Sequence, residues 1–237
     1  SELVQKIGDL CGNCIFKLAQ VCYQLNEDLR EKCEELQLDR YGISKEDTSV
    51  SLLKVSPRIV DVTPLTGLTS LKELDIRCND IEDMTPLAGL TALTYLNLSC
   101  NQITDVEPLA GLPALTALNL EKNQIQDVAP LAGLIALTEL RLRCNQIIDV
   151  SPLAGLTALT ELSLSSNQIH DVAPLAELTT LTILCLSHNN IVDVTPLAGL
   201  TALTRLYLHF NHIWHEDVNK TRLLIDRLED DGCSVFY

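Results

Sequence analysis

Apolar residues recur along most of this chain in one pattern with a fixed period of 22 residues. The stretch from Leu93 to Ala114, LTYLNLSCNQITDVEPLAGLPA, is one of seven copies. Within it Leu93, Leu96 and Leu98 are separated by mostly polar residues, as in a short half-buried strand. A unit of this size cannot bury its apolar side alone. The pattern therefore predicts a stack of units that share one core.

Three other positions recur with the same period and predict the turns of each unit. They are an asparagine (Asn79, Asn101, Asn123, Asn145, Asn167, Asn189 and Asn211), a proline (Pro64 to Pro196) and an aspartate three residues before each proline (Asp61 to Asp193). A buried asparagine amide can satisfy backbone groups where a strand ends in a tight turn. Proline suits the first position of a helical turn. The aspartate can accept from free amides at the start of that turn.

The aspartate column also suggests a ladder of calcium sites, but one carboxylate per turn provides too few oxygen ligands for this ion. We therefore expect capping. Gly111 recurs in every unit except one, where Glu177 stands. Positive φ is thus not expected at this position.

The chain on either side of the array, which spans residues 49–213, predicts two caps. In residues 1–48 the spacing of Leu3, Ile7 and Leu10, continued to Leu25, predicts an amphipathic helix, and a shorter second helix runs to about Leu38. Residues 214–237 predict a helix that ends at Gly232, followed by a final strand. Both segments would shield the apolar ends of the stack.

Cysteine and charge limit the kinds of partner and site. Nine cysteines, an odd number, indicate reduced thiols and an intracellular setting. Cys11 and Cys14 have the spacing of a zinc-binding pair, but a second pair is missing, so we expect no metal there. The net charge of −15 argues against nucleic acid, although seven of the 16 acidic residues in 49–210 are the repeated aspartates. No run of about 18 apolar residues predicts a membrane span.

Residues that differ from unit to unit must carry any information about a ligand. The outward strand positions differ strongly, and adjacent strands about 4.8 Å apart would make them one continuous face. Arginine and tyrosine there are favoured interface residues. The candidate partner-binding residues are Asp75, Arg77, Tyr95, Asn97, Asn119, Glu121, Glu139, Arg141, Arg143, Glu161, Arg205, Tyr207 and His209.

Other candidate chemistry is weaker. Cys78 and Cys100 occupy one column in neighbouring units and could form a disulfide, but in-register parallel side chains rarely offer its dihedral angle, so free thiols are expected. His209, His212 and His215 resemble a metal cluster in sequence, but they straddle a corner of the chain. Cys185 with a nearby histidine could be a nucleophile, but an open sheet neither excludes water nor orients a base. Motifs for phosphate binding, serine hydrolysis or zinc proteolysis are absent from the sequence.

The repeated unit L-x-x-L-x-L-x-x-N-x-I-x-D-V-x-P-L closely resembles the leucine-rich repeat in its 22-residue bacterial form, as in internalins. The resemblance covers residues 49–213, as seven regular units and a degenerate first one in which Leu52 lies 22 residues before Leu74. It implies an α/β fold. This is a right-handed solenoid with a parallel sheet on its concave side, short 3-10 or extended convex segments, a helical N-terminal cap and a helix-plus-strand C-terminal cap.

In function, the resemblance implies a non-catalytic module, expected to be a monomer without cofactor, that binds another protein on the concave face. One alternative is the recognition arm of a larger enzyme or effector. Another is a consensus-like scaffold with no natural ligand. Internalins are surface or secreted proteins poor in cysteine, and this chain departs from them in its cysteine content.

Overall fold

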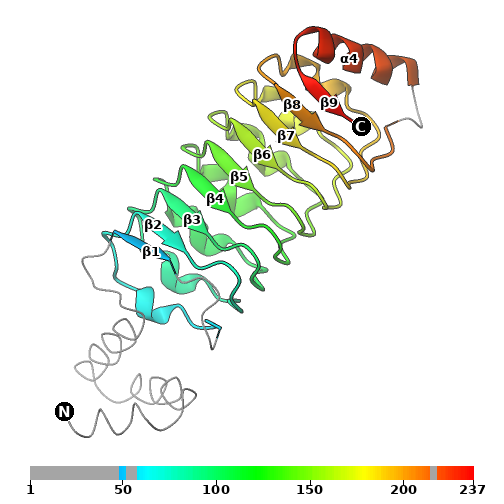
Figure 1. Ribbon diagram of the computed structural model, residues 1–237. Helices are drawn as coiled ribbons and strands as arrows, with labels where there is room; N and C mark the ends of the chain where they lie inside the picture. The colour runs from blue at the N-terminus through cyan, green and yellow to red at the C-terminus, as the bar shows by residue number, and fades with distance from the viewer. Residues whose placement is uncertain (1–47, 52–57, 214–217) are drawn as a thin grey trace, which may run out of the picture.

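The computed structural model describes residues 48–51, 58–213 and 218–237, which form a curved solenoid (Figure 1). A nine-stranded parallel sheet runs along it in sequence order. Its strands are β1 (Ser49–Ser51), β2 (Glu73–Asp75), β3 (Tyr95–Asn97), β4 (Ala117–Asn119), β5 (Glu139–Arg141), β6 (Glu161–Ser163), β7 (Ile183–Cys185), β8 (Arg205–Tyr207) and β9 (Ser234–Phe236). The predicted N-terminal helices and their cysteines lie outside the described residues.

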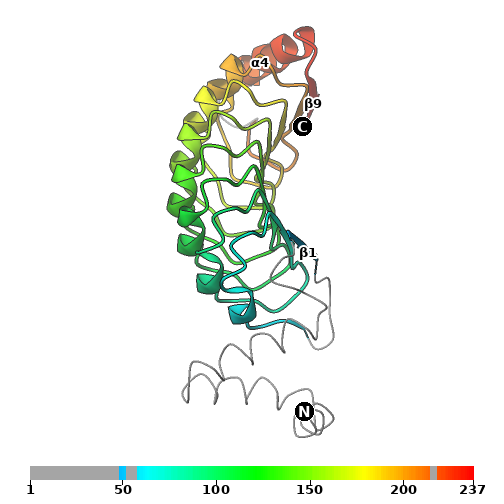
Figure 2. The same ribbon diagram turned by 90° about the vertical axis from the view of Figure 1, so that its left-hand side faces the viewer.

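Short 3-10 helices line the convex side, and Figure 2 shows them along the outer curve with the strands on the inner one. They are η1 (Thr63–Leu65), η2 (Thr85–Leu87), η3 (Glu107–Gly111), η4 (Ala129–Gly133), η5 (Ser151–Gly155), η6 (Ala173–Glu177) and η7 (Thr195–Gly199). Each begins with the repeated proline in its first turn, as predicted. Strands therefore approach each other on the concave side while the helices spread on the convex side.

Each unit supplies one layer of a continuous aliphatic core. In the copy that begins at Leu93, the buried side chains also include Leu96, Leu98, Ile103 and Val106, each at most 1% exposed. Leu109 and Leu112 complete the layer. Strands and 3-10 helices contact their counterparts in adjacent units. Stability therefore comes from stacking neighbours, as in other solenoids.

The repeated asparagines connect each unit to the preceding one. The Asn101 side-chain Nδ2 donates to Leu98 O at 2.9 Å in its own unit and to Ile76 O at 3.2 Å in the unit before. Its Oδ1 accepts from the Ile81 amide at 3.1 Å. The same bonds recur along the array and form an asparagine ladder, which confirms the predicted role of this column.

The repeated aspartates cap the 3-10 helices. Asp105 Oδ1 accepts from the Glu107 amide at 2.8 Å, and the equivalent bond has the same length in all seven units. The predicted capping role is confirmed. In the glycine column, Gly67 is the exception to the expectation, with φ at +88° beside the shortened helix η1.

The register of the first unit differs from the prediction. Val50, not Leu52, pairs with Leu74. Val50 precedes Ile59 by nine residues, whereas Leu74 precedes Ile81 by seven. The first unit therefore carries two additional residues between its strand and its return segment, and a fixed 22-residue spacing misplaces the strand. Leu52 itself lies outside the described residues.

The C-terminal segment contributes the helix α4 (Val218–Asp230) and the last strand, as predicted. Leu224 and Leu228 bury the inner side of α4, which packs against η7 and β9. The helix ends in a Schellman motif: Gly232, at φ +92°, donates to Glu229 O at 3.0 Å, and Cys233 donates to Leu228 O at 2.9 Å. No helix in the described part of the chain has the length and apolarity that a membrane span needs.

Candidate protein-binding face

The outer positions of the strands and the residues just after them lie on the concave face of the sheet. The middle leucine of each regular strand, such as Leu118, is buried beneath them. Twelve of the 13 predicted site residues are exposed or half-buried on this face: Asp75, Arg77, Tyr95, Asn119, Glu121, Glu139, Arg141, Arg143, Glu161, Arg205, Tyr207 and His209. The structure thus brings the predicted residues together as one surface.

Asn97 is the exception, because it is only 2% exposed. Its Oδ1 accepts from the Ser99 amide at 3.1 Å and from the Ser99 hydroxyl at 2.8 Å, and its Nδ2 donates to the Tyr95 hydroxyl at 3.3 Å. The side chain supports its neighbours and presents almost no surface. We therefore remove Asn97 from the candidate face and retain Tyr95, which it orients.

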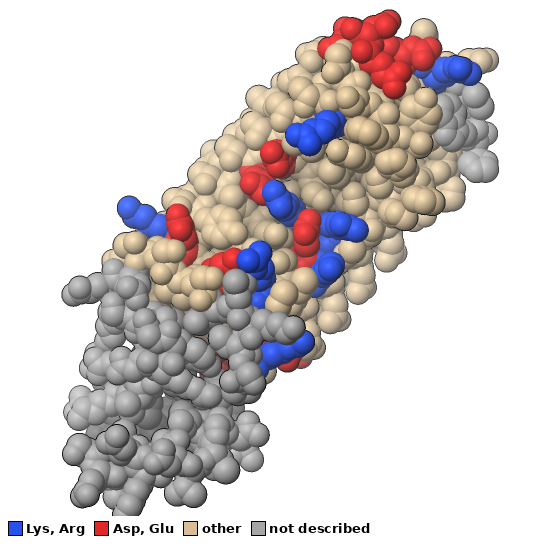
Figure 3. Space-filling model, viewed as in Figure 1, with Lys and Arg blue, Asp and Glu red and all other residues tan. Residues whose placement is uncertain are grey.

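Charged residues are concentrated on the N-terminal half of the face, where several pair with each other. Arg141 contacts Glu139 and lies 3.9 Å from a Glu161 oxygen, and Arg77 lies 3.5 Å from Asp75. Figure 3 shows red and blue side chains interspersed there and few over the half toward β8. These exposed pairs contribute little to stability. They leave a mixed-charge surface whose two signs nearly balance.

The column of residues just after the strands has an unusual backbone. Cys78, Cys100, Lys122, Cys144, Ser166, His188 and Phe210 all have φ between 55° and 59°. Residues other than glycine and asparagine rarely adopt this left-handed backbone conformation. The backbone is held there by bonds between units, such as Lys122 N to Arg143 O at 2.8 Å. Sequence reasoning identified this column but missed its conformation, because no glycine marks it.

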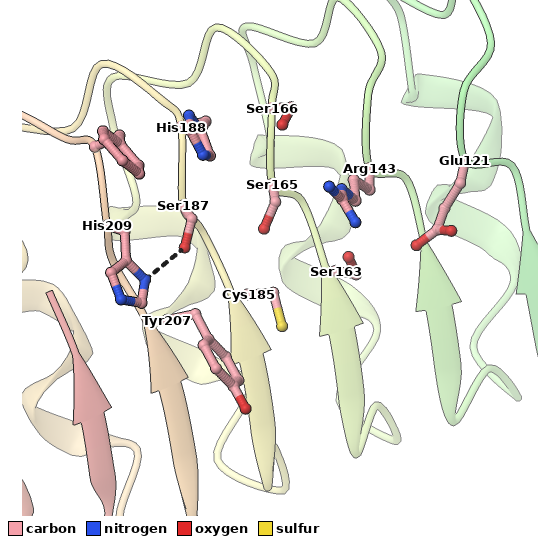
Figure 4. Close-up of a pocket in the computed structure, with 11 residues that line it drawn as sticks. Glu121, Arg143, Ser163, Ser165, Ser166, Cys185, Ser187, His188, Tyr207 and His209 are labelled. Atoms are coloured by element: carbon pink, nitrogen blue, oxygen red, sulfur yellow. Dashed lines mark hydrogen bonds between the residues drawn. The ribbon is translucent and has the colours of Figure 1, made fainter.

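A hollow of about 470 Å³ lies on the C-terminal half of the face (Figure 4). Its central lining consists of small side chains from the units of β6 and β7. We call it the serine basin and define its floor as Ser163, Ser165, Ser166, Cys185 and Ser187. The basin exists because two neighbouring columns carry small residues in both units and a third column carries Ser166 in the unit of β6, while larger residues stand on both sides.

Aromatic rings form the C-terminal wall of the basin. His188 stacks on Phe210 with ring centroids 4.3 Å apart, and Tyr207 stacks on Phe236 of β9 at 4.7 Å. His209 lies 3.5 Å from the Ser187 hydroxyl. The predicted site list omitted His188, Phe210 and Phe236. The first two could have been found, because they occupy successive positions of one 22-residue column.

Arg143 and Glu121 form the opposite wall. Figure 4 shows Arg143 between Glu121 and the serines. The two side chains project from neighbouring units, but neither forms an ion pair among the described residues. Both charges are therefore available to a ligand.

The cysteines of the concave face have the properties of structural residues and not of catalytic nucleophiles. Burial, and secondarily Glu161, raise the pKa of the Cys185 thiol, so it stays protonated and is a poor nucleophile. Cys78 and Cys100 are free, as predicted. Burial and the neighbouring Cys78 raise the pKa of Cys100.

Metal ligands do not converge in the part of the chain that the structure describes. No group of three histidine, cysteine, aspartate or glutamate side chains there is arranged to hold an ion. His215, the third histidine of the sequence pattern that resembles a metal cluster, lies outside the described residues.

Comparisons with known proteins agree with this architecture. The family model "Leucine rich repeat" matches residues 69–125, and "Leucine Rich repeats (2 copies)" matches residues 135–177 and 179–220. These models describe repeats and not a catalytic domain. A comparison with curated protein sequences gave no match.

Two similar solved structures are internalins of Listeria monocytogenes strain 4b F2365. Internalin C2 (inlC2) is 37% identical with a TM-score of 0.72, over 81% of this chain and 88% of that one. The internalin inlF is 39% identical with a TM-score of 0.69, over 76% of this chain and 51% of that one, so this chain spans about half of its length. The plant peptide hormone receptor RGFR1 in complex with RGF2, 23% identical with a TM-score of 0.57 over 64% of this chain and 26% of that one, shares the fold.

Proposed function

Because the chain belongs to the leucine-rich repeat family, in its internalin-like class, we propose that its concave face binds another protein and that the chain catalyses no reaction itself. Members of this family are generally protein-interaction modules. For this chain we further propose that arginine and tyrosine residues of the concave face make the contact and that the chain has no catalytic role.

The main support is where the units differ. Core leucines, asparagines, aspartates and prolines repeat because they build the frame. The concave columns change from unit to unit: the first position of successive strands reads Glu73, Tyr95, Ala117, Glu139, Glu161, Ile183 and Arg205. Side chains that vary in this way can distinguish one partner from another, whereas the repeated residues cannot. Exposed Arg141, Arg143 and Tyr95 are residue types that anchor protein interfaces.

The charge of the face favours a protein over nucleic acid. The chain as a whole carries −15, and the face itself mixes both signs, so it offers no basic track for a phosphate backbone. We propose that the chain acts as a monomer, without a cofactor and away from membranes.

A larger protein could use the same face. The chain spans only about half of the inlF chain, which keeps open the role of recognition arm in a longer enzyme or effector. Sequencing of the complete gene separates this possibility from a self-contained module. The third possibility, a scaffold with no ligand, is tested by the following experiment.

The test is selection of binders from a displayed library of natural protein domains. One variant replaces Tyr95, Arg141 and Arg143 with alanine on the concave face. A matched control replaces Glu82, Glu177 and Ile135 with alanine, since these exposed residues lie away from the concave columns. We expect the concave variant to lose the selected domains and the control to retain them, with both giving wild-type circular dichroism. Equal binding by the two variants, or no specific binder at all, would refute the proposal.

A further inference from the structure

The space over Ser166 in the serine basin is one unit of the array wide, which is close to the spacing of stacked aromatic rings. Units follow each other at about 4.8 Å along the sheet, so β5 and β7 lie about 10 Å apart. His188 already stacks on Phe210 at 4.3 Å, and the next position of that column toward the N-terminus holds only Ser166. A ring placed over Ser166 would extend this stack by one layer.

The wall of the basin has features that the frame does not require. Phe210 is 74% exposed at a position where the frame imposes φ near 56° but does not require an aromatic ring. Cysteine, lysine or serine stands at this position in other units and meets the same backbone requirement. The frame therefore explains the backbone at Phe210 but not its exposed ring, which suits a contact with a ligand.

The remaining lining favours a ring that also carries a hydrogen-bonding group. Ser163, Ser165 and Ser187 place hydroxyls on the floor, and Glu121 offers a carboxylate at the N-terminal wall. The guanidinium of Arg143 can stack on an aromatic face. Tyrosine and tryptophan combine a large flat apolar body with one polar group and are the side chains most enriched at interface hot spots.

We propose that the serine basin receives one tyrosine or tryptophan side chain of the partner protein, stacked on His188 over Ser166 and bordered by Arg143. This inference rests on the proposed function, since it names the chemistry by which the concave face recognises its partner. The polar group of the ring points toward the serine hydroxyls and Glu121, where it finds an acceptor.

Other small ligands match the lining of the basin less well. A nucleotide would bring phosphate toward a single guanidinium that has a carboxylate beside it, on a chain of net charge −15. A sugar would bond to the hydroxyls but would not continue the aromatic stack. Both are outcomes of the test below.

The test is a nuclear magnetic resonance titration of isotope-labelled protein with small probes. They are N-acetyltyrosinamide, N-acetyltryptophanamide, N-acetylleucinamide, uridine monophosphate and methyl glucoside. We expect the two aromatic amides to shift the signals of Ser166, Ser187 and His188. Their affinity should be about three to ten times that of the leucine amide. Stronger shifts from the nucleotide or the sugar would overturn the inference.

Two matched variants test where in the basin the ring of the probe binds. Ser166→Phe fills the slot and should abolish the shifts, and the left-handed backbone accepts it as it accepts Phe210. Cys144→Phe puts the same ring one unit away in the same conformation, where it borders the slot, so binding is retained or strengthened. Arg143→Gln, an exposed change that leaves the frame intact, should weaken binding about threefold. Unchanged aromatic binding by both Ser166→Phe and Arg143→Gln would refute the inference.

The two proposals fail in different ways. If library domains depend on Tyr95 and Arg141 but bind Ser166→Phe as well as the wild type, the inference fails and the proposed function stands. If the aromatic amides bind the basin but the selected domains bind elsewhere on the chain, the proposed function fails, and only the affinity of the basin for an aromatic ring stands.

Discussion

Replacing Asn145 with alanine should destabilise the array by about 2–4 kcal/mol. The Asn145 Nδ2 donates to Leu142 O and to Leu120 O, both at 3.0 Å, and its Oδ1 accepts from the Ile125 amide at 3.0 Å. The residue is 8% exposed and lies in the middle of the asparagine ladder. Alanine would leave the Ile125 amide unpaired and remove one of two bonds from each carbonyl, since Leu120 O also accepts from Asn123 and Leu142 O from Asn167.

The magnitude follows from the cost of those groups. A buried donor or acceptor without a partner costs about 1–3 kcal/mol. The unpaired Ile125 amide accounts for that cost, and the two bonds lost at carbonyls that keep another donor add about 0.5 kcal/mol each. The loss is larger than that of an ordinary surface substitution, which changes stability by about 0.5 kcal/mol or less.

Urea denaturation followed by circular dichroism would measure the loss, with two controls. Gln124→Ala changes an exposed side chain beside another member of the ladder and should be nearly neutral. Asn211→Ala removes the same three kinds of bond, to Leu186 O, Leu208 O and the Ile191 amide, but from a half-buried side chain at the last regular unit. The loss of stability for Asn211→Ala should be smaller, because water can bond to the backbone groups that lose the asparagine side chain.

Two results would refute this reasoning. A loss below about 1 kcal/mol for Asn145→Ala would mean that the turn relaxes and pairs its groups in another way. Equal losses for Asn145→Ala and Asn211→Ala would mean that burial does not set the cost of the ladder. Because long arrays can unfold in segments, the fitted m-value must stay constant for the comparison to hold.

Three further outcomes are expected. Hydrogen bonds from the side chain and then the backbone of the residue two positions later lower the pKa values of Asp83, Asp149 and Asp193, so their stabilisation is present above pH 4 and is lost as pH falls through the lowered pKa. Replacing all three with asparagine should flatten the dependence of the urea midpoint on pH between 5 and 2, and an unchanged slope would contradict the capping account. Lys122→Asn should raise the free energy of unfolding by about 0.5–1 kcal/mol because asparagine tolerates φ of 55°, whereas Lys122→Ala should not. Gly232→Ala should cost about 1 kcal/mol or more at φ +92° and lower the thermal midpoint; no change would mean that the end of α4 is not fixed by its cap.

The parts of the fold that the sequence predicted are those that depend on one unit and its copy. Strand alternation, the proline at each helical turn, the capping aspartates and the bonding of the asparagines all follow from local geometry repeated every 22 residues. The register of β1 could not be predicted this way, because two additional residues in the first unit break the period. The left-handed column was also missed, since bonds between units impose a conformation that Cys100 or Phe210 would not choose alone.

The candidate site was predicted in outline and not in detail. Alternation along each strand placed the variable residues on one face, because that rule needs no knowledge of neighbours. The burial of Asn97 depends on bonds to Tyr95 and Ser99, which residue type alone does not reveal. The serine basin needs several units at once, since small residues in three columns make a hollow only where large ones flank them.

The asparagine ladder has a direction, since every asparagine serves the turn before it and none serves the turn after. Excising one complete coil, or inserting another, would therefore rejoin the chain with every donor again opposite an acceptor. The length of the inner surface can thus change by whole coils, each bringing or removing three side chains of its own. A protein built this way can acquire a new specificity by duplication and exchange of coils, while a cut at any other spacing would leave amides facing nothing.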